Sequence, residues 1–292
     1  MKCFIKQSVL ILGFLGMGIL SNIPEAAAVN LTVKTGYADQ QSTVNADGGF
    51  DYLPNGDVVI IRNGIALTPF IYIVDANGDN VPAAPQLIGS MPSGTFSSFI
   101  KVSPNGTFAV FGATGSTNPI SKINLSTFAI TNITSISGNQ SLAFLSNNEV
   151  LISYNASFSP ASPNQIAYFQ LSNPSSQRVL ADIANTPSGP IALKGGNLYY
   201  VKSTWAFPAP PNSHRLLKFP KAKMDQALST GIILRESDAQ LITTLDGGYE
   251  LAVNEFSDIL VTDLSGRVFK VNELTGAKEN FCITQNFPNE GS

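Results

Sequence analysis

The chain has 292 residues, of which 13% are charged and 43% hydrophobic, and its formal net charge is −3 at pH 7. No run of basic residues occurs, and because binding to a phosphate backbone needs clustered lysine and arginine, the sequence excludes a nucleic-acid partner. Its 24 glycines and 18 prolines, set against so few charges, favour short strands joined by many turns.

The first 28 residues have the features of a secretory signal peptide. Lys2 and Lys6 precede the apolar run Val9–Leu20, and Ala26–Ala28 is a small-residue cleavage site. That run is too short to span a membrane comfortably, and no later segment has about 18 consecutive apolar residues. We therefore expect a secreted or periplasmic protein with no membrane span after cleavage, in which residues 29–292 form one domain, and we expect it to be a monomer.

A hairpin motif recurs five times in the rest of the chain. Each copy is an apolar-rich stretch, a tight turn and five more strand-like residues. The predicted hairpins are 50–61, 100–111, 143–153, 191–201 and 251–262. The first residues after the turns, Asp57, Thr107, Glu149, Asn197 and Asp258, are separated by 50, 42, 48 and 61 residues. Asn-Gly and Gly-Gly suit these turns because both sequences accept positive φ.

A third and a fourth strand are predicted after each hairpin. The third strands are 70–74, 120–125, 166–171, 216–219 and 268–271. The fourth strands are 86–89, 128–133, 178–183, 232–235 and 281–284, and residues 221–228 favour a short helix. Four antiparallel strands repeated about every 40 to 50 residues predict an all-β fold, a β-propeller of four-stranded antiparallel blades, with five blades. The alternatives are a sixth blade that includes residues 31–44, or a β-sandwich or β-helix.

Two short motifs resemble those of known propellers. The turn Ser103-Pro104-Asn105-Gly106 is similar to a Ser-Pro-Asp-Gly turn, and Gly196–Val201 followed by Arg215–Pro220 is similar to paired outer strands. Through these two motifs the chain resembles the superfamily of bacterial secreted β-propellers that includes the NHL, YncE-like and SMP-30-like groups. For the SMP-30-like lactonases the resemblance implies a central divalent metal held by Glu and by Asn or Asp. Asn254 and Glu255 stand at such a place, but the other units supply no matching partners.

Two neighbouring loops are the candidate ligand-binding region. Loops that join second to third strands open on one face of a propeller, and 155–165 and 203–214 combine length with aromatic residues. The candidate ligand-binding residues are Trp205, Phe207, His214, Asn155 and Phe158. Three prolines stiffen the second loop, so an aromatic surface there would lose little entropy on binding. The alternatives are that Trp205 plugs the face of the ring or packs between blades, and that His214 points into solvent.

No motif for a catalytic nucleophile, a multi-histidine metal site or a phosphate loop occurs. The leading hypothesis is therefore an exported, non-catalytic binding propeller that recognises a glycan, a peptide or another cell-envelope component. The alternative is a secreted hydrolase, either lactonase-like or acting on glycans. It would use a divalent metal or channel carboxylates, for which Asp51, Glu255 and Asp47 are the candidates, although three of the five predicted inner strands contain no acid.

One segment resembles the beginning of a calcium loop. Asp75, Asn77 and Asp79 place oxygen-bearing side chains at alternate positions. Asn80 then replaces the expected glycine and Gln86 the expected glutamate, so a plain turn is the alternative. A calcium ion bound there would be structural, on the face opposite Trp205.

Overall fold

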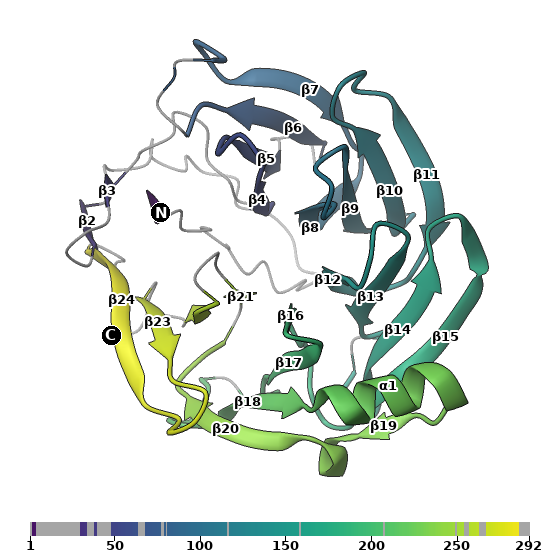
Figure 1. Cartoon of the computed structure of the whole chain (residues 1–292), viewed down its shortest axis with the longest axis vertical. Helices are drawn as coiled ribbons and strands as arrows, with labels where there is room; N and C mark the ends of the chain where they lie inside the picture. The colour runs from purple at the N-terminus through teal and green to yellow at the C-terminus, as the bar shows by residue number, and fades with distance from the viewer. Residues whose placement is uncertain are drawn as a thin grey trace, which may run out of the picture.

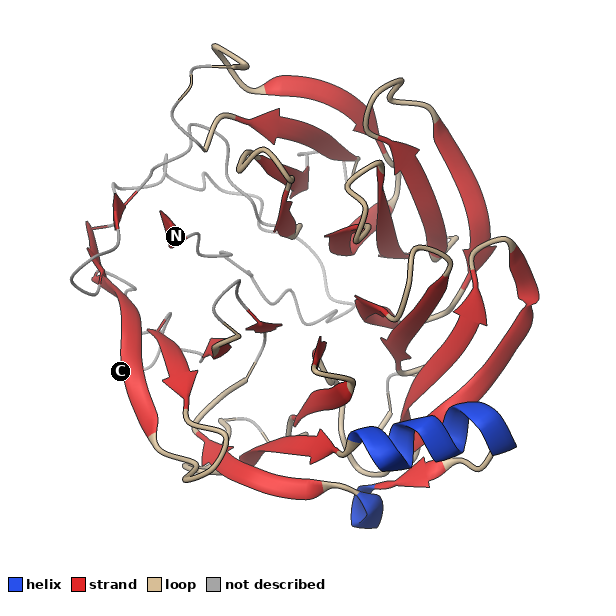
Figure 2. Ribbon diagram, in the orientation of Figure 1, coloured by secondary structure: helices blue, strands red, loops and turns tan. Residues whose placement is uncertain are grey.

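Five small antiparallel sheets follow one another around a central axis in the computed structural model of the chain (Figure 1). The structure describes residues 2–3, 30–33, 38–39, 48–63, 68–76, 79, 81–115, 117–157, 159–206, 208–248, 250–253, 257–262 and 267–285. Nearly all regular structure in these ranges is β-strand (Figure 2). The predicted all-β fold and the five blades of the propeller are confirmed.

Each blade is a meander whose strands are paired in chain order from the inside of the ring to the outside. Blade 1 consists of β4 (Phe50–Tyr52), β5 (Val58–Asn63), β6 (Pro69–Val74) and β7 (Gln86–Ser90). Blade 2 consists of β8 (Thr95–Val102), β9 (Phe108–Gly115), β10 (Pro119–Asn124) and β11 (Ile130–Ser135). Blade 3 begins with β12 (Asn139–Phe144), β13 (Glu149–Tyr154), β14 (Asn164–Gln170) and β15 (Asn173–Ile183). Blade 4 consists of β16 (Ile191–Lys194), β17 (Asn197–Lys202), β18 (His214–Phe219) and β20 (Gln240–Leu245). Blade 5 begins with β21 (Leu251–Val253), β22 (Ile259–Thr262), β23 (Arg267–Val271) and β24 (Lys278–Gln285).

The N-terminal strand adds to blade 5 and does not begin a sixth blade. Strand β2 (Asn30–Val33) pairs antiparallel with β24, with Asn30 opposite Gln285 and Val33 opposite Cys282. Strand β24 already completes the four-stranded blade, so β2 is a fifth, outer strand. A separate short pair consists of β1 (Lys2–Cys3) and β3 (Ala38–Asp39), which are parallel.

The predicted fourth strand of blade 4 is wrong. Residues Leu234–Arg235 form β19, which pairs parallel with β15 at the outer edge of blade 3, and β20 supplies the fourth strand of blade 4 instead. The cause is an insertion, residues 220–239, between β18 and β20. It contains α1 (Lys221–Thr230), which confirms the predicted helix, and the 3₁₀ helix η1 (Glu236–Asp238).

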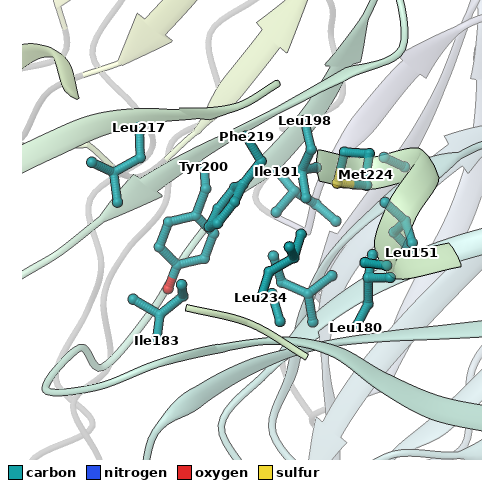
Figure 3. Close-up of a cluster of buried hydrophobic side chains, with 14 residues drawn as sticks. Leu151, Leu180, Ile183, Ile191, Leu198, Tyr200, Leu217, Phe219, Met224 and Leu234 are labelled. Carbon is teal, nitrogen blue, oxygen red and sulfur yellow. The ribbon is translucent and has the colours of Figure 1, made fainter. Parts of the chain in front are cut away.

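The core lies between consecutive blades. Residues of the second strands are buried on both faces because each blade stacks on its neighbours, so β5 begins with the continuous buried run Val58–Ile61. The largest cluster joins blades 3 and 4 and includes Tyr200 and Phe219 (Figure 3). Other clusters join blades 1 and 2, blades 2 and 3, and blades 4 and 5.

The turns between first and second strands have the predicted positive φ, with values of 91° at Gly56, 70° at Gly106 and 78° at Gly196. Turns of adjacent blades also lie against each other. A Cβ added at Gly106 would lie 2.1 Å from Cγ of Pro54, and Asn105 N donates to Asn147 Oδ1 over 3.0 Å. Among the described residues, no helix has the length and apolar character needed to cross a membrane.

Candidate functional site

The two loops singled out in the sequence belong to neighbouring blades and open at the same end of them. The Asn155 loop, residues 155–163, joins β13 to β14 in blade 3. The Trp205 loop, residues 203–213, joins β17 to β18 in blade 4. The linker 184–190 passes from blade 3 to blade 4 at this end of the blades.

Thr186 in the linker connects the two loops. Asn155 Nδ2 donates to the carbonyl oxygen of Thr186 over 3.2 Å, and Ser203 N donates to Thr186 Oγ1 over 3.1 Å. The hydroxyls of Thr186 and Ser203 also lie 3.2 Å apart, and Ser203 Oγ donates to the carbonyl oxygen of Ser188 over 2.7 Å. All three side chains, of Asn155, Thr186 and Ser203, are buried, so these bonds fix the spacing of the loops where water cannot compete.

A second polar network lies beneath the linker. Gln140 Nε2 donates to the carbonyl oxygen of Pro187 over 2.7 Å, and Gln140 Oε1 accepts from Asn164 Nδ2 over 2.7 Å. The Tyr200 hydroxyl donates to Asn164 Oδ1 over 2.9 Å. Burial raises the pKa of Tyr200, which therefore stays protonated and remains a donor. Gly189 is required here, because an added Cβ would lie 2.0 Å from the Tyr200 ring.

The candidate residues divide into buried supports and a partly exposed aromatic. Asn155 and His214 are 1% and 2% exposed, so neither presents its side chain to solvent, and the alternative of a solvent-facing His214 is wrong. Burial lowers the pKa of His214 and the nearby Asp246 offsets part of that change, which favours a neutral imidazole. Trp205 is partly exposed. Phe158 and Phe207 lie outside the described residues.

The far end of the Trp205 loop is tied to the end of β20. Asn212 N donates to Asp246 Oδ1 over 2.8 Å, and Thr244 Oγ1 donates to Asn212 Oδ1 over 3.1 Å. Asn212 has a φ of 56°, in the left-handed region that asparagine tolerates better than most residues. The loop that carries Trp205 is therefore held in one conformation at this end.

The candidate channel acids do not form a pair among the described residues. Asp51 is the one acid in the inner strands β4, β8, β12, β16 and β21 as described. Its Oδ2 accepts a hydrogen bond from Val102 N over 2.7 Å, which joins the inner strands of blades 1 and 2. Asp47, Asn254 and Glu255 lie outside the described residues, so a pairing of any of them with Asp51 stays a prediction.

The segment that resembles a calcium loop lies beside a further carboxylate, that of Asp57, which was not predicted from the sequence. One carboxylate oxygen each of Asp57, Asp75 and Asp79 lies within 4.8 Å of the others, whereas Asn77 lies outside the described residues. Asp57 is 2% exposed and accepts from Asn55 Nδ2 over 2.7 Å and from Ala76 N over 3.3 Å. The signal for Asp57 was present in the repeat, because turns after first and third strands share one face.

These three carboxylates fit a hard divalent cation. Calcium takes six to eight oxygen ligands at about 2.3–2.6 Å, so two oxygens on one ion are separated by at most about 5 Å. The three oxygens, all within 4.8 Å of one another, meet that limit. The cluster lies at the ends of blade 1 opposite the face of the Asn155 and Trp205 loops, where a bound ion would join the β4–β5 turn to the β6–β7 connection.

No protein-family model matches the sequence, and no curated protein matches it. Solved structures do resemble it. The tricorn protease has a TM-score of 0.53 at 10% identity, over 82% of this chain and 27% of that one. A Xanthomonas campestris gluconolactonase has a TM-score of 0.52 at 11% identity, over 75% of this chain and 71% of that one. A Bacteroides thetaiotaomicron protein of unknown function has a TM-score of 0.53 at 10% identity, over 80% and 56%.

The likeness is one of fold. At such identities it places the chain among β-propeller proteins and assigns no activity. The chain spans about a quarter of the length of the tricorn protease that it matches and just over half of the Bacteroides protein.

Proposed function

We propose that the protein is an exported binding propeller that recognises a glycan, a peptide or another cell-envelope component through the Asn155 and Trp205 loops. The observation that carries this proposal is the connection of both loops through Thr186, which sets two loops of adjacent blades side by side. A surface held in place before binding loses little conformational entropy when a ligand arrives.

The chemistry of the face supports recognition more than bond cleavage. A partly exposed tryptophan on a proline-stiffened loop offers a rigid apolar plane, although its N–H group is buried, and such a plane suits stacking on a sugar ring or a peptide side chain. His214 is buried beside that loop, and the described inner strands hold the single acid Asp51. The described part of the face therefore combines buried polar residues with a partly exposed tryptophan.

The proposal is tested by screening the purified mature chain against arrays of cell-envelope glycans and peptides. The variant Trp205→Ala should lose the captured ligands. Leu274→Ala is the matched control, because Leu274 is 95% exposed on the turn between β23 and β24, on the opposite face. Equal capture by both variants and the wild type would reject the Trp205 loop as the binding surface.

We also propose that Asp57, Asp75 and Asp79 hold a structural calcium ion. Three carboxylates within 4.8 Å repel one another, and a divalent cation between them would turn that repulsion into attraction. The ion would stabilise blade 1 and would take no part in ligand recognition, because it lies at the opposite end of the blades.

A further inference from the structure

The insertion 220–239 is seated in the core that joins blades 3 and 4. Met224 and Ala227 of α1 and Leu234 of β19 are all buried in the cluster drawn in Figure 3, together with Leu180 and Ile183 of β15. Figure 1 shows α1 on the outer side of the ring beside these two blades. The position of the insertion is therefore set by both blades.

Polar contacts fix the same insertion to blade 3. Arg178 lies over the Tyr168 ring and donates through Nη1 to the carbonyl oxygen of Ala227 over 3.1 Å and through Nη2 to that of Leu228 over 2.6 Å. These carbonyl groups belong to the last turns of α1, where cationic donors are favoured. Further along, Arg235 forms an ion pair with Asp182, its register partner on β15.

Glu236 reaches from the insertion to the base of the Trp205 loop. Its Oε2 lies 2.6 Å from Lys202 Nζ, and its Oε1 lies 3.3 Å from Arg215 Nη1. Lys202 and Arg215 are register partners on β17 and β18, at the place where the loop leaves the blade. One carboxylate therefore binds both sides of the loop base.

The main chain that carries Glu236 is itself held in place. Asp238 accepts from Arg235 N over 2.9 Å and pairs with Lys223 of α1 at 3.0 Å, and Ala239 N donates to the Glu236 carbonyl oxygen over 3.0 Å. These bonds close the turn η1 on both sides of Glu236. The Glu236 carboxylate is thus aimed at the loop base by the insertion.

We infer that the insertion 220–239 is a brace that sets the conformation of the Trp205 loop, with Glu236 as the positioning residue. The inference deepens the proposed function and rests on it, since it assigns the loop as the binding element. Glu236 lies at the loop base and is assigned no contact with ligand. It acts by holding Lys202 and Arg215 together, so that Trp205 keeps the orientation in which it meets a ligand.

The test uses the single tryptophan of the chain as its reporter, in the absence of ligand. In Glu236→Gln the quenching of Trp205 fluorescence by acrylamide should rise by about twofold, because the loss of a partly exposed ion-pair network shifts a local equilibrium by a factor of that order. Hydrogen exchange of residues 203–213 should become faster in the same variant. Asp225→Asn is the matched control, because it removes an exposed pair with Lys221 in the same insertion, and it should leave both readouts unchanged.

A second variant keeps the inference falsifiable if Glu236→Gln folds poorly. Lys202→Gln should raise the quenching by a similar factor, and the double variant should add little, since both changes break one network. Quenching and exchange equal to those of the wild type in folded Glu236→Gln or Lys202→Gln would overturn the inference. Because fluorescence quenching and hydrogen exchange need no ligand, they test the brace even if the proposed binding function is wrong. If a ligand is found, binding that is lost in Trp205→Ala but kept at full affinity in Glu236→Gln would contradict the brace and leave the binding function standing.

Discussion

Asn155 donates a hydrogen bond from Nδ2 to the carbonyl oxygen of Thr186 over 3.2 Å, although the two residues are 31 positions apart in the chain. The side chain of the same threonine accepts a hydrogen bond from Ser203 N over 3.1 Å. A short linker between blades therefore holds two loops, and its geometry sets the distance between them.

Replacing Thr186 by valine should destabilise the protein by about 1 kcal/mol, because the buried N–H of Ser203 loses its shorter hydrogen bond and keeps only the one of 3.4 Å to the Ser188 carbonyl oxygen, while the volume is kept. Chemical denaturation measures the free energy of unfolding. Thr275→Val is the control, since Thr275 Oγ1 accepts from Ala277 N in an exposed turn, and it should cost less. Equal losses in both variants would show that burial of the Thr186 network contributes nothing.

Because of Glu273, the contact between blades 4 and 5 should contribute less to the free energy of unfolding at acid pH than at neutral pH. Burial raises the pKa of Glu273, but hydrogen bonds from Lys218 and Lys194 outweigh it and hold the pKa at about 2. Because the pKa is lower in the folded chain than in the unfolded chain, this stabilisation is present at neutral pH and is lost as the pH falls from about 5 towards 2.

The variant Glu273→Gln should therefore lower the free energy of unfolding by at most about 3 kcal/mol at pH 7, and the difference from the wild type should shrink towards zero near pH 2. Denaturant titrations over that pH range measure it. Asp225→Asn, which changes an exposed carboxyl, should give a smaller difference. A loss for Glu273→Gln that does not vary with pH would contradict the assigned linkage.

Gly106 should be among the least replaceable glycines of the hairpin turns. Gly106→Ala adds both the strain of a φ of 70° and a clash with Pro54, so we expect a loss of about 2–3 kcal/mol in unfolding free energy. Gly231→Ala separates the two effects, because Gly231 has a φ of 77° and no atom within 4 Å of an added Cβ. It should cost only about 1 kcal/mol. Equal costs would mean that the contact between turns of blades 1 and 2 adds nothing.

Calcium should raise the melting temperature of metal-free protein. At about a hundred times the dissociation constant, a ligand that binds only the folded state adds about 2.7 kcal/mol to the free energy of unfolding. The calcium-dependent rise should disappear in Asp57→Asn and persist in Asp225→Asn. A melting temperature that is the same with calcium and with chelator in the wild type would reject the ion.

The repeat carried enough information in the sequence to predict the propeller. Apolar stretches around Pro54-Asn55-Gly56 and Pro104-Asn105-Gly106 define hairpins by local chemistry, because few sequences accept the positive φ of these turns. The error at residues 232–235 has a different origin. Those residues look like a strand, and Leu234–Arg235 do form one. Leu234, however, pairs with a strand of the previous blade, and periodicity holds no information about pairing partners.

The candidate site was less predictable. Residue type and loop length pointed to Asn155 and His214 as surface groups, whereas the structure buries both, since burial depends on contacts with other blades. Thr186 and Glu236 gave no signal, because a threonine in a linker or a glutamate after a short strand is common in any chain. Their roles come from partners 17 and 34 residues away, Ser203 and Lys202 respectively.

The fluorescence of Trp205 during titration with a captured glycan or peptide tests the central claim most directly. Since the chain has one tryptophan, any change in emission reports on that loop. Binding should shift or quench the emission in a saturable way, and mass spectrometry should recover the ligand unchanged. A ligand that binds without altering Trp205, or one that is recovered hydrolysed, would contradict a non-catalytic binding propeller that acts through the Trp205 loop.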